Sequence, residues 1–447
     1  MLRAAFALLF SLPLSAAPLQ ILAIGDSLTE EYAFEIPFTA PVSDSTNANI
    51  RNWPELLRIF RASEADLGLP YEGTVLSYPD LRDGGHPLNF GIPGFTITDW
   101  RTIINTSSYP NPFDSDFFLL LSYYETRLSL IEQIPNADVV VIFLGGNDLK
   151  ENYFNIFAGT ESGNYYSNLV EELRDIHDFV FTQDSTIPIV VCTIPDVGAT
   201  PQLYNSYTDP IMAASARAKI AALNQDIIDM VAEENAKAGH NVDSAVARID
   251  HLTDRTFDQS PFQLNGSYFT LEGDPENPPD RVFARDNFHP STVAQALITN
   301  EIMEAINEAA GTSLTPFTDR EILANLLGLD PDQPFLDWID GYTVADTSMT
   351  GDSDHDRLPN IVEMALGTPP DQPSSPISGN WLPTTGLTWT PDPLAADYVD
   401  LFAEESTDLD SWDPVPQSRL LEDNGTMTAS PPVGPTSHFG RLNALPR

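Results

Sequence analysis

Four short segments of the chain place nucleophilic, basic, acidic and amide groups within a few residues of glycine or proline. They are Gly25–Thr29, Asn89–Thr96, Gly145–Asp148 and Asp286–Pro290. In chain order they offer a serine, a glycine-rich turn, an asparagine amide and an Asp-x-x-His pair. A serine hydroxyl attacks a carbonyl carbon when a base removes its proton, and amide donors stabilise the oxyanion that forms. These residue types could therefore carry out acyl transfer if folding brings them together.

A parallel sheet flanked by helices is the architecture that the apolar pattern predicts. Apolar runs indicate buried strands at Leu19–Ile24, Val139–Leu144 and Ile187–Thr193, with weaker candidates at Pro87–Phe90 and Ala245–Ile249. Helical patterns lie between and after them, at about Asp116–Gln133, Tyr166–Thr182, Ile211–Ala238 and Ser291–Ala310. Strands alternating with helices predict an α/β fold with both faces of the sheet covered. Because ligands bind at the carboxyl ends of such strands, the residues that follow each strand are the candidate site.

Together and in this order, the four segments resemble the SGNH or GDSL-type serine hydrolase family over roughly Leu19–Ala310. The resemblance implies a three-layer α/β/α sandwich with a parallel, flavodoxin-like sheet. It implies that Ser27 is the nucleophile, His289 the general base and Asp286 the group that orients the base. It also implies an oxyanion hole formed by the backbone N–H groups of Ser27 and Gly94 and by the side-chain amide of Asn147. This chemistry requires no metal or other cofactor.

Structural roles are the alternatives for three of these residues. Asn147 could cap the N-terminus of a helix, since asparagine is a favoured capping residue. Asp286 could likewise cap the helix predicted to begin near Ser291. Gly94 could be only a turn glycine, because Gly91 is a nearby alternative donor.

A short acidic segment has the spacing of a calcium-binding loop. Counted from Asp352, oxygen-bearing side chains occupy positions 1, 3, 5, 9 and 12, as in an EF-hand, where the last glutamate binds Ca²⁺ through both oxygens. These residues are Asp352, Asp354, Asp356, Asn360 and Glu363. The segment also resembles dockerin-like and thrombospondin type-3-like repeats, but Arg357 stands where an EF-hand has its glycine. A structural Ca²⁺ site and a solvated acidic linker are the two interpretations.

Charge and the N-terminal residues indicate where the protein works. The chain has 21 basic and 65 acidic residues and a net charge of −44, which argues against nucleic acid as a partner. Met1–Pro18 has an arginine, an apolar run and then small residues, which is the pattern of a secretory signal peptide. The sequence therefore predicts a secreted, extracellular or periplasmic protein.

The composition predicts four parts: a signal peptide over residues 1–17, a hydrolase domain over 18–311, an acidic linker with the EF-hand-like loop over 312–379, and a small β module over 380–447. Proline and aspartate multiply in the third part. The β module could contact glycans or the cell surface, or could only stabilise the protein. Trp389 and Trp412 could stack on sugars or belong to its core.

The leading functional hypothesis is a secreted carboxylic-ester hydrolase that acts through an acyl-enzyme on Ser27. Its substrate could be an acylated carbohydrate, a lipid or a small ester. A lipase or phospholipase of the same family is the nearest alternative. A non-catalytic, Ca²⁺-dependent surface-binding protein on the same fold is the alternative of another class. The joint presence of the serine, the amide and the Asp-x-x-His pair argues against it.

Overall fold

A computed structural model describes residues 17–33, 50–69, 80–82, 84–237, 242–257, 261–374, 386–432 and 439–447. Almost all of the predicted signal peptide lies outside these residues. Among the residues that are described, no helix is both long enough and apolar enough to cross a membrane. The chain forms two compact units. The first comprises Met1–Asp254, Asp274–Asn277 and Phe283–Pro316, and the second comprises Arg255–Gly273, Pro278–Val282 and Phe317–Arg447.

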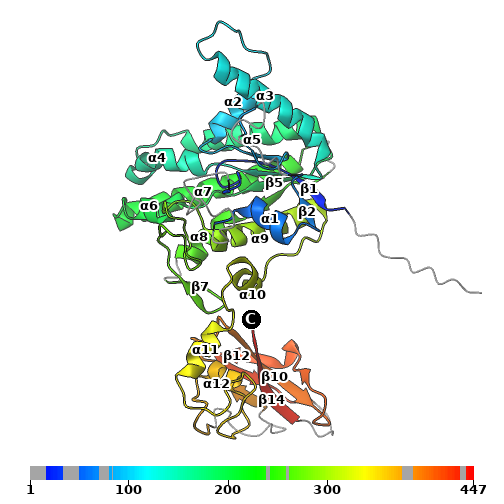
Figure 1. Ribbon diagram of the computed structural model, residues 1–447, viewed down its shortest axis with the longest axis vertical. Coiled ribbons are helices and arrows are strands. Elements are labelled where there is room, and N and C mark those ends of the chain that lie inside the picture. Colours follow the sequence, from blue (N-terminus) through cyan, green and yellow to red (C-terminus); the bar gives the residue numbers. More distant parts are fainter. Residues whose placement is uncertain are drawn as a thin grey trace, which may run out of the picture. The chain divides into compact units, whose positions relative to one another are not determined.

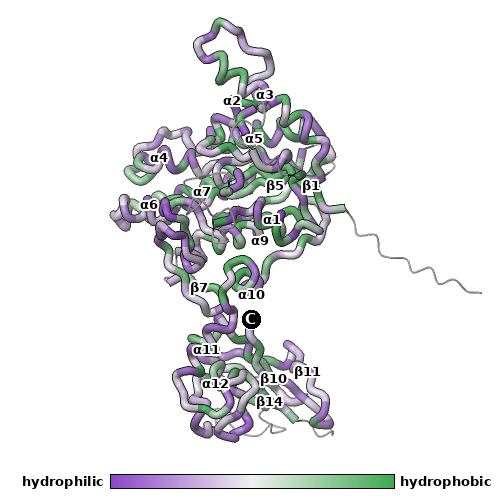
Figure 2. Tube along the Cα trace, in the orientation of Figure 1, coloured by the Kyte–Doolittle hydropathy of each residue, from purple (hydrophilic) through white to green (hydrophobic). Residues whose placement is uncertain are grey.

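A parallel sheet forms the centre of the first unit, with strand order β2-β1-β4-β5-β6 and with β3 pairing with the end of β1. Its strands are β1 (Leu19–Gly25), β2 (Ala65–Asp66), β3 (Asn89–Gly91), β4 (Val139–Phe143), β5 (Ile189–Cys192) and β6 (Ala245–Ala247). Every residue of β4 and β5 is buried, and Figure 2 shows the middle of the sheet as hydrophobic. A strand with helices on both faces has no solvated side, which explains these continuous apolar runs.

Helices flank this sheet (Figure 1). They are α1 (Trp53–Phe60), α2 (Ile97–Asn105), α3 (Phe117–Gln133), α4 (Gly146–Ala158), α5 (Tyr165–Gln183), α6 (Pro201–Tyr204), α7 (Pro210–Asn235), α9 (Thr292–Ala310) and α8 (Ile249–Phe257), which begins in this unit. Single turns of 3₁₀ helix occur at η1 (Ile134–Asn136) and η2 (Val197–Ala199). Helix α1 packs on α9, and α5 packs on both α2 and α7. The predicted α/β fold with a helix-flanked parallel sheet is confirmed.

The second unit consists of antiparallel sheets and short helices. One sheet has the order β11-β10-β14, another β12-β13-β9, and β7 pairs with β8. The strands are β7 (Phe262–Leu264), β8 (Ser267–Phe269), β9 (Leu387–Trp389), β10 (Val399–Ser406), β11 (Asp413–Pro414), β12 (Leu420–Asp423), β13 (Thr426–Ala429) and β14 (Phe439–Pro446). The helices are α10 (Asp319–Glu321), the π-helical turn η3 (Ile322–Leu326), α11 (Gln333–Asp340), α12 (Asn360–Leu366) and the 3₁₀ turn η4 (Gln417–Arg419). The β-rich C-terminal region predicted from the sequence is present.

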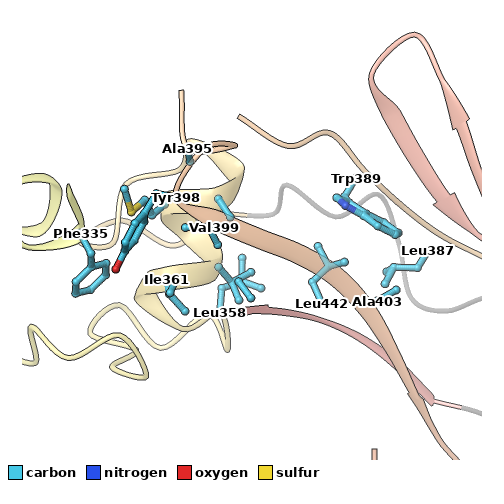
Figure 3. Close-up of a cluster of buried hydrophobic side chains, with 14 of the residues drawn as sticks. Phe335, Leu358, Ile361, Leu387, Trp389, Ala395, Tyr398, Val399, Ala403 and Leu442 are labelled. Carbon is cyan, nitrogen blue, oxygen red and sulfur yellow. The ribbon is translucent and has the colours of Figure 1, made fainter. Parts of the chain in front are cut away.

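One hydrophobic core joins these helices to the sheets (Figure 3). It contains Phe335 of α11, Ile361 of α12, Trp389 of β9 and Leu442 of β14. The predicted division between a linker over 312–379 and a β module over 380–447 is therefore not how the structure divides the chain, because α11 and α12 supply part of the core of the sheets. Trp389 is only 2% exposed, so it belongs to this core and is not available to stack on a sugar.

Candidate active site

Ser27 lies in a tight turn directly after β1, at the carboxyl edge of the sheet. The turn closes on Asp26, whose carbonyl oxygen accepts the N–H groups of Thr29 and Glu30, both at 3.0 Å. The Asp26 carboxylate accepts the N–H of Leu28 at 2.9 Å. A Cβ at Gly25 would lie 2.1 Å from the Thr29 hydroxyl oxygen, so no larger residue fits at the end of the strand. The serine is thereby fixed where ligands of parallel sheets bind.

His289 and Asp286 lie beside Ser27 in one continuous chain of hydrogen bonds. The Ser27 Oγ is 2.8 Å from His289 Nε2, and His289 Nδ1 is 2.5 Å from Asp286 Oδ2. With the imidazole proton on Nδ1, the Asp286 carboxylate accepts that proton's hydrogen bond and Nε2 faces the serine hydroxyl. The sequence separates Ser27 from His289 by 262 positions, so the fold alone creates this geometry.

A compact turn presents the aspartate and the histidine together. The N–H of Ala284 donates to the His289 carbonyl at 2.8 Å, and the N–H of Asn287 donates to the Ala284 carbonyl at 2.9 Å. Asn287 has a left-handed backbone with a φ of 63°, which asparagine tolerates better than most residues. The turn brings the Asp286 carboxylate back to the imidazole of His289, three residues later.

The electrostatics of the turn keep Asp286 ionised. Burial raises the pKa of this carboxyl, but the hydrogen bond and charge of His289 act in the opposite direction. The N–H groups of Phe288 and His289 also donate to Asp286 Oδ1, at 3.1 and 3.0 Å. The pKa of Asp286 is therefore held below its usual value. An ionised carboxylate at this position favours a positive charge on the imidazole.

Two backbone N–H groups, one in the turn after β1 and one in the turn after β3, are available to an oxyanion. Within the described residues, the N–H groups of Ser27 and Gly94 donate to no acceptor. Gly94 has a φ of +77°, and a Cβ there would meet nothing within 4 Å, so it faces open space. Gly91, the alternative donor, belongs to β3, and its N–H donates to Asn89 Oδ1 at 2.9 Å. The geometry favours Gly94 over Gly91.

Asn147 lies in the first turn of α4, with its side chain facing the same region. Its Nδ2 donates to the Phe95 carbonyl at 3.1 Å and lies 3.4 Å from Asp26 Oδ2, a long contact. The N-cap of α4 is Gly145, with a φ of 109°, so Asn147 is not the capping residue. The N-cap of α9 is Ser291, so Asp286 is not a cap either. Both structural alternatives raised from the sequence lose their support.

Asp148 was not singled out by sequence reasoning as a site residue, but it connects α4 to the glycine turn. Its Oδ2 accepts the N–H of Ile97, the first residue of α2, at 2.9 Å. Burial raises the pKa of Asp148 to about 7, although this hydrogen bond opposes the increase. The residue ties the segment that carries Gly94 to the helix that carries Asn147. Its place directly after Asn147 was the signal available in the sequence.

An exposed apolar surface lies on and before α3. Phe113 and Phe118 are 95% and 80% exposed, and Leu119 is 49% exposed. The ring of Tyr123, on the same helix, contacts Phe95 edge-on, with centroids 6.3 Å apart. Phe95 directly follows Gly94 in the sequence. Helix α3 therefore contacts the segment that carries Gly94 through this one pair of rings.

The acidic residues lie in the second unit. Asp352, Asp354 and Asp356 each offer an oxygen, and these oxygens lie within 4.8 Å of one another. Glu363 is fully buried on α12. Asn360 starts that helix, and its Nδ2 donates to the carbonyls of Asp346 and Ser348 at 2.9 and 2.8 Å.

The fold and the site define an ester hydrolase of the SGNH type, with a helix-flanked parallel sheet and a serine–histidine–aspartate arrangement at its edge. The chain belongs to the family described as GDSL-like lipase/acylhydrolase, which it matches over residues 21–302, more than half of its length. The family resemblance stated from the four segments is confirmed. A search of curated proteins finds no match for this chain.

Solved structures with similarity to the chain include two esterases. One is a carbohydrate esterase family 3 protein from Talaromyces cellulolyticus, with 14% identity and a TM-score of 0.34; the match covers 66% of this chain and 100% of that one. The other is a family 3 carbohydrate esterase of Clostridium thermocellum, with 18% identity and a TM-score of 0.32; the match covers 65% of this chain and 96% of that one. Likeness at this level carries no information about the substrate.

Proposed function

We propose that the protein hydrolyses carboxylic esters through an acyl-enzyme on Ser27, with His289 as the general base and Asp286 as its orienting group. The observation that carries the proposal is the unbroken hydrogen-bond chain from the Ser27 hydroxyl through both imidazole nitrogens to the Asp286 carboxylate. A neutral Nε2 at 2.8 Å from Oγ is within the range needed for proton transfer. The ionised aspartate stabilises the imidazolium that results.

The reaction proceeds in two balanced halves. In the first, Ser27 Oγ bonds to the ester carbonyl carbon while its proton passes to His289 Nε2. The imidazolium then returns that proton to the leaving alkoxide as the C–O bond breaks, which leaves an acyl-enzyme. In the second half, water attacks the acyl carbon and loses a proton to the same nitrogen. The imidazolium then returns this proton to Ser27 Oγ as the bond between Oγ and the acyl carbon breaks, which releases the carboxylic acid and restores the serine.

The oxyanion of each tetrahedral intermediate is stabilised by three donors in this proposal. The N–H groups of Ser27 and Gly94 supply two hydrogen bonds. The third comes from Asn147 Nδ2, whose bond to the Phe95 carbonyl at 3.1 Å fixes the amide plane. The longer 3.4 Å contact with Asp26 is the one that an oxyanion would displace. Donors that are oriented before the reaction need no reorganisation when charge develops.

An uncharged ester is the favoured substrate class, in particular an acylated carbohydrate or a small ester. The net charge of −44 repels substrates that carry negative charge.

We also propose that the protein is exported, because of the pattern of Met1–Pro18. N-terminal sequencing of protein recovered outside the cytoplasm would test this, and a retained Met1 would contradict it.

Glycan or cell-surface contact through the second unit is a further proposal that rests on the sequence; co-sedimentation with insoluble polysaccharides would test it.

A lipid ester is the second candidate, and the apolar surface on α3 is the observation that favours it. Exposed Phe113, Phe118 and Leu119 could contact an acyl chain or a lipid surface, since large exposed aromatic side chains often mark interaction sites. Tyr123 of the same helix contacts Phe95, which links α3 to the segment that carries Gly94.

A series of p-nitrophenyl esters from C2 to C16 distinguishes these candidates. We expect activity to decline with chain length for an acetyl or carbohydrate esterase, and to rise with chain length and with substrate aggregation for a lipase. A fluorophosphonate probe should label the wild-type protein and should fail to label Ser27→Ala. Equal labelling of the two proteins would show that the nucleophile is another residue.

A further inference from the structure

Among the described residues, three aspartates of the second unit each place one carboxylate oxygen close to the others, with no ion pair to a basic side chain. The carboxylate oxygens of Asp352, Asp354 and Asp356 lie within 4.8 Å of one another. Asp352 Oδ1 and Asp354 Oδ2 are buried and have no hydrogen-bond partner among the described residues. Carboxylates at this separation repel one another, and a cation between them would offset that repulsion.

Glu363 gives an independent indication that a cation belongs here. Its side chain is fully buried, and neither Oε1 nor Oε2 has a hydrogen-bond partner within the described part of the chain. It interacts electrostatically with Asp352, Asp354 and Asp356, so it belongs to the same group of carboxylates. A divalent cation would satisfy both oxygens and offset the charge of the aspartates.

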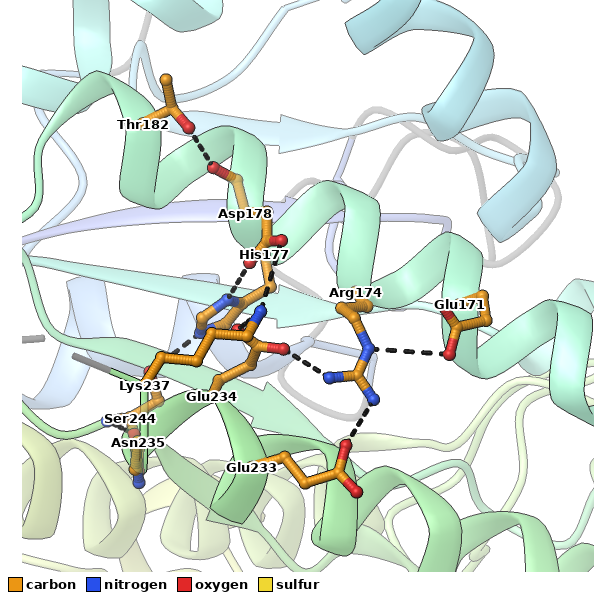
Figure 4. Close-up of polar contacts among 10 residues, drawn as sticks. All are labelled: Glu171, Arg174, His177, Asp178, Thr182, Glu233, Glu234, Asn235, Lys237 and Ser244. Carbon is orange, nitrogen blue, oxygen red and sulfur yellow. Dashed lines mark hydrogen bonds and ion pairs between the residues drawn. The ribbon is translucent and has the colours of Figure 1, made fainter. Parts of the chain in front are cut away.

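A second group of acidic residues and a histidine shows the contrast (Figure 4). His177, Asp178 and Glu234 also bring three potential ligand atoms within 4.8 Å. There, Arg174 and Lys237 both form ion pairs with Glu234, and Lys237 also pairs with Asp178 at 3.6 Å. Protein cations already neutralise that group, so it requires no metal. No ion pair joins an arginine, lysine or histidine to the carboxylates of the acidic loop in the described structure.

We propose that the loop from Asp352 to Glu363 binds one Ca²⁺, with ligands from the three aspartates and from both carboxylate oxygens of Glu363. The proposal is independent of the ester hydrolase activity. Ca²⁺ accepts six to eight oxygens in flexible geometry and commonly takes a carboxylate through both oxygens, whereas Mg²⁺ requires a tight octahedron and retains its waters. A loop with three close aspartates and a glutamate with two unpartnered oxygens suits the larger ion.

The structure shows the conformation of two residues of the loop. Arg357 departs from the EF-hand pattern, and Asn360 was assigned as a ligand from that pattern. Arg357 replaces the EF-hand glycine but has a φ of 78°, the left-handed conformation that the glycine normally provides. Its side chain is exposed and leaves the loop interior clear. Asn360 uses its Nδ2 to hold the carbonyls of Asp346 and Ser348. Its Oδ1 has no partner in the described structure, which suits the position that often reaches Ca²⁺ through a water.

Calcium binding should stabilise the whole second unit, because the ligands are attached to its core. Glu363 lies on α12, between Ile361, Val362 and Ala365 of the hydrophobic core. Asp356 Oδ2 also accepts the N–H and the hydroxyl of Ser374, at 2.8 and 3.1 Å. Since a ligand that binds only the folded state stabilises it, CaCl₂ should raise the unfolding temperature of this unit.

Calorimetric titration of the EDTA-treated full-length protein with CaCl₂ tests the proposal, with MgCl₂ and NaCl at equal ionic strength as comparisons. We expect one Ca²⁺ per chain with a Kd of about 1 mM or tighter, as in extracellular calcium modules, and a higher unfolding temperature in Ca²⁺ alone. Glu363→Gln should weaken binding at least tenfold. Asp354→Asn, which changes a half-exposed residue, should do the same and provides the test if the glutamate variant fails to fold.

The matched control is Glu422→Gln, which removes the same charge at an exposed position on β12 of the same unit. This variant should bind Ca²⁺ as the wild-type protein does. The proposal is overturned if the wild-type protein gives neither binding heat nor thermal stabilisation with Ca²⁺. It is also overturned if MgCl₂ or NaCl stabilises equally, or if Glu422→Gln loses as much affinity as Asp354→Asn.

Discussion

Asp286→Asn is the substitution that isolates the role of the aspartate from its effect on the fold. Asp286 Oδ1 accepts two backbone N–H groups, at 3.1 and 3.0 Å, and an asparagine carbonyl oxygen can retain both. Oδ2, which receives His289 Nδ1 at 2.5 Å, becomes an NH₂ group that can only donate. The imidazole must then carry its proton on Nε2, where it faces Ser27 and cannot act as a base.

The expected loss follows from this change of tautomer. Comparable substitutions in serine–histidine–aspartate sites lower kcat by about 10⁴, which corresponds to about 5.4 kcal/mol of transition-state stabilisation. The variant loses one charge-assisted hydrogen bond, so the free energy of unfolding should fall by only about 1.5–3 kcal/mol. Steady-state kinetics on p-nitrophenyl acetate at pH 7.5, together with thermal unfolding, would measure both effects. KM should change little, because the aspartate does not contact the substrate.

The pH dependence provides a second measurement on the same variant. The pKa of Asp286 is lower in the folded protein than its ordinary value, which is about 3.9 for an unperturbed aspartate. Its ionised form therefore stabilises the wild-type fold above about pH 4, and this contribution disappears as the pH falls through the folded-state pKa. The stability difference between wild type and Asp286→Asn should narrow in that range. A loss in kcat of less than tenfold, with the fold intact, would refute the assigned role.

Three further substitutions test one oxyanion donor and the residue that supports another. Asn147→Ala should lower kcat by about 10²–10³ with little change in KM, because the lost hydrogen bond forms mainly in the transition state; an unchanged kcat in steady-state assays would remove Asn147 from the mechanism. Asp148→Asn should retain the bond to Ile97 and most activity, whereas Asp148→Ala should lose at least tenfold in kcat as the Gly94 segment shifts. The pKa of Asp148 is raised to about 7, so its contribution to stability is present below about pH 4 and is lost as the pH rises to about 7. Asp148→Asn should therefore show a smaller decrease in unfolding temperature between pH 4 and pH 8 than wild type; identical profiles would contradict the raised pKa.

The long, strongly patterned elements were predictable from the sequence, and the short ones beside the motifs were not. The apolar run Val139–Leu144 corresponds to β4 (Val139–Phe143), and the pattern Tyr166–Thr182 corresponds to α5 (Tyr165–Gln183). Helix α4 was not predicted, because Gly145-Gly146 at its start is typical of a turn. The left-handed φ of 109° at Gly145 shows that the same glycines both turn the chain and begin the helix.

Local patterns also could not predict which segments that are far apart in the sequence come together in the fold. The pairing of Ser27 with His289 came from the family resemblance, because no local rule relates residues that far apart. The core of the second unit is a similar case. Ile361 and Leu442 pack in one cluster, but the proline-rich stretch between α12 and β9 indicated a linker. The local sequence indicates where a helix begins and ends. It does not indicate which distant strand that helix will pack against.

The order of the site along the chain has a consequence for when activity can arise during protein synthesis. The nucleophile belongs to the first strand, while the base lies 262 residues later, in the turn before α9. A ribosome has therefore made nearly the whole first unit before a base is present to activate Ser27. Until that turn emerges and docks at the sheet edge, the nascent chain carries an inert serine, so esters encountered early in synthesis are not hydrolysed. Chains cut short before Asp286 should accumulate as inactive protein, whatever the state of the strand that carries the nucleophile.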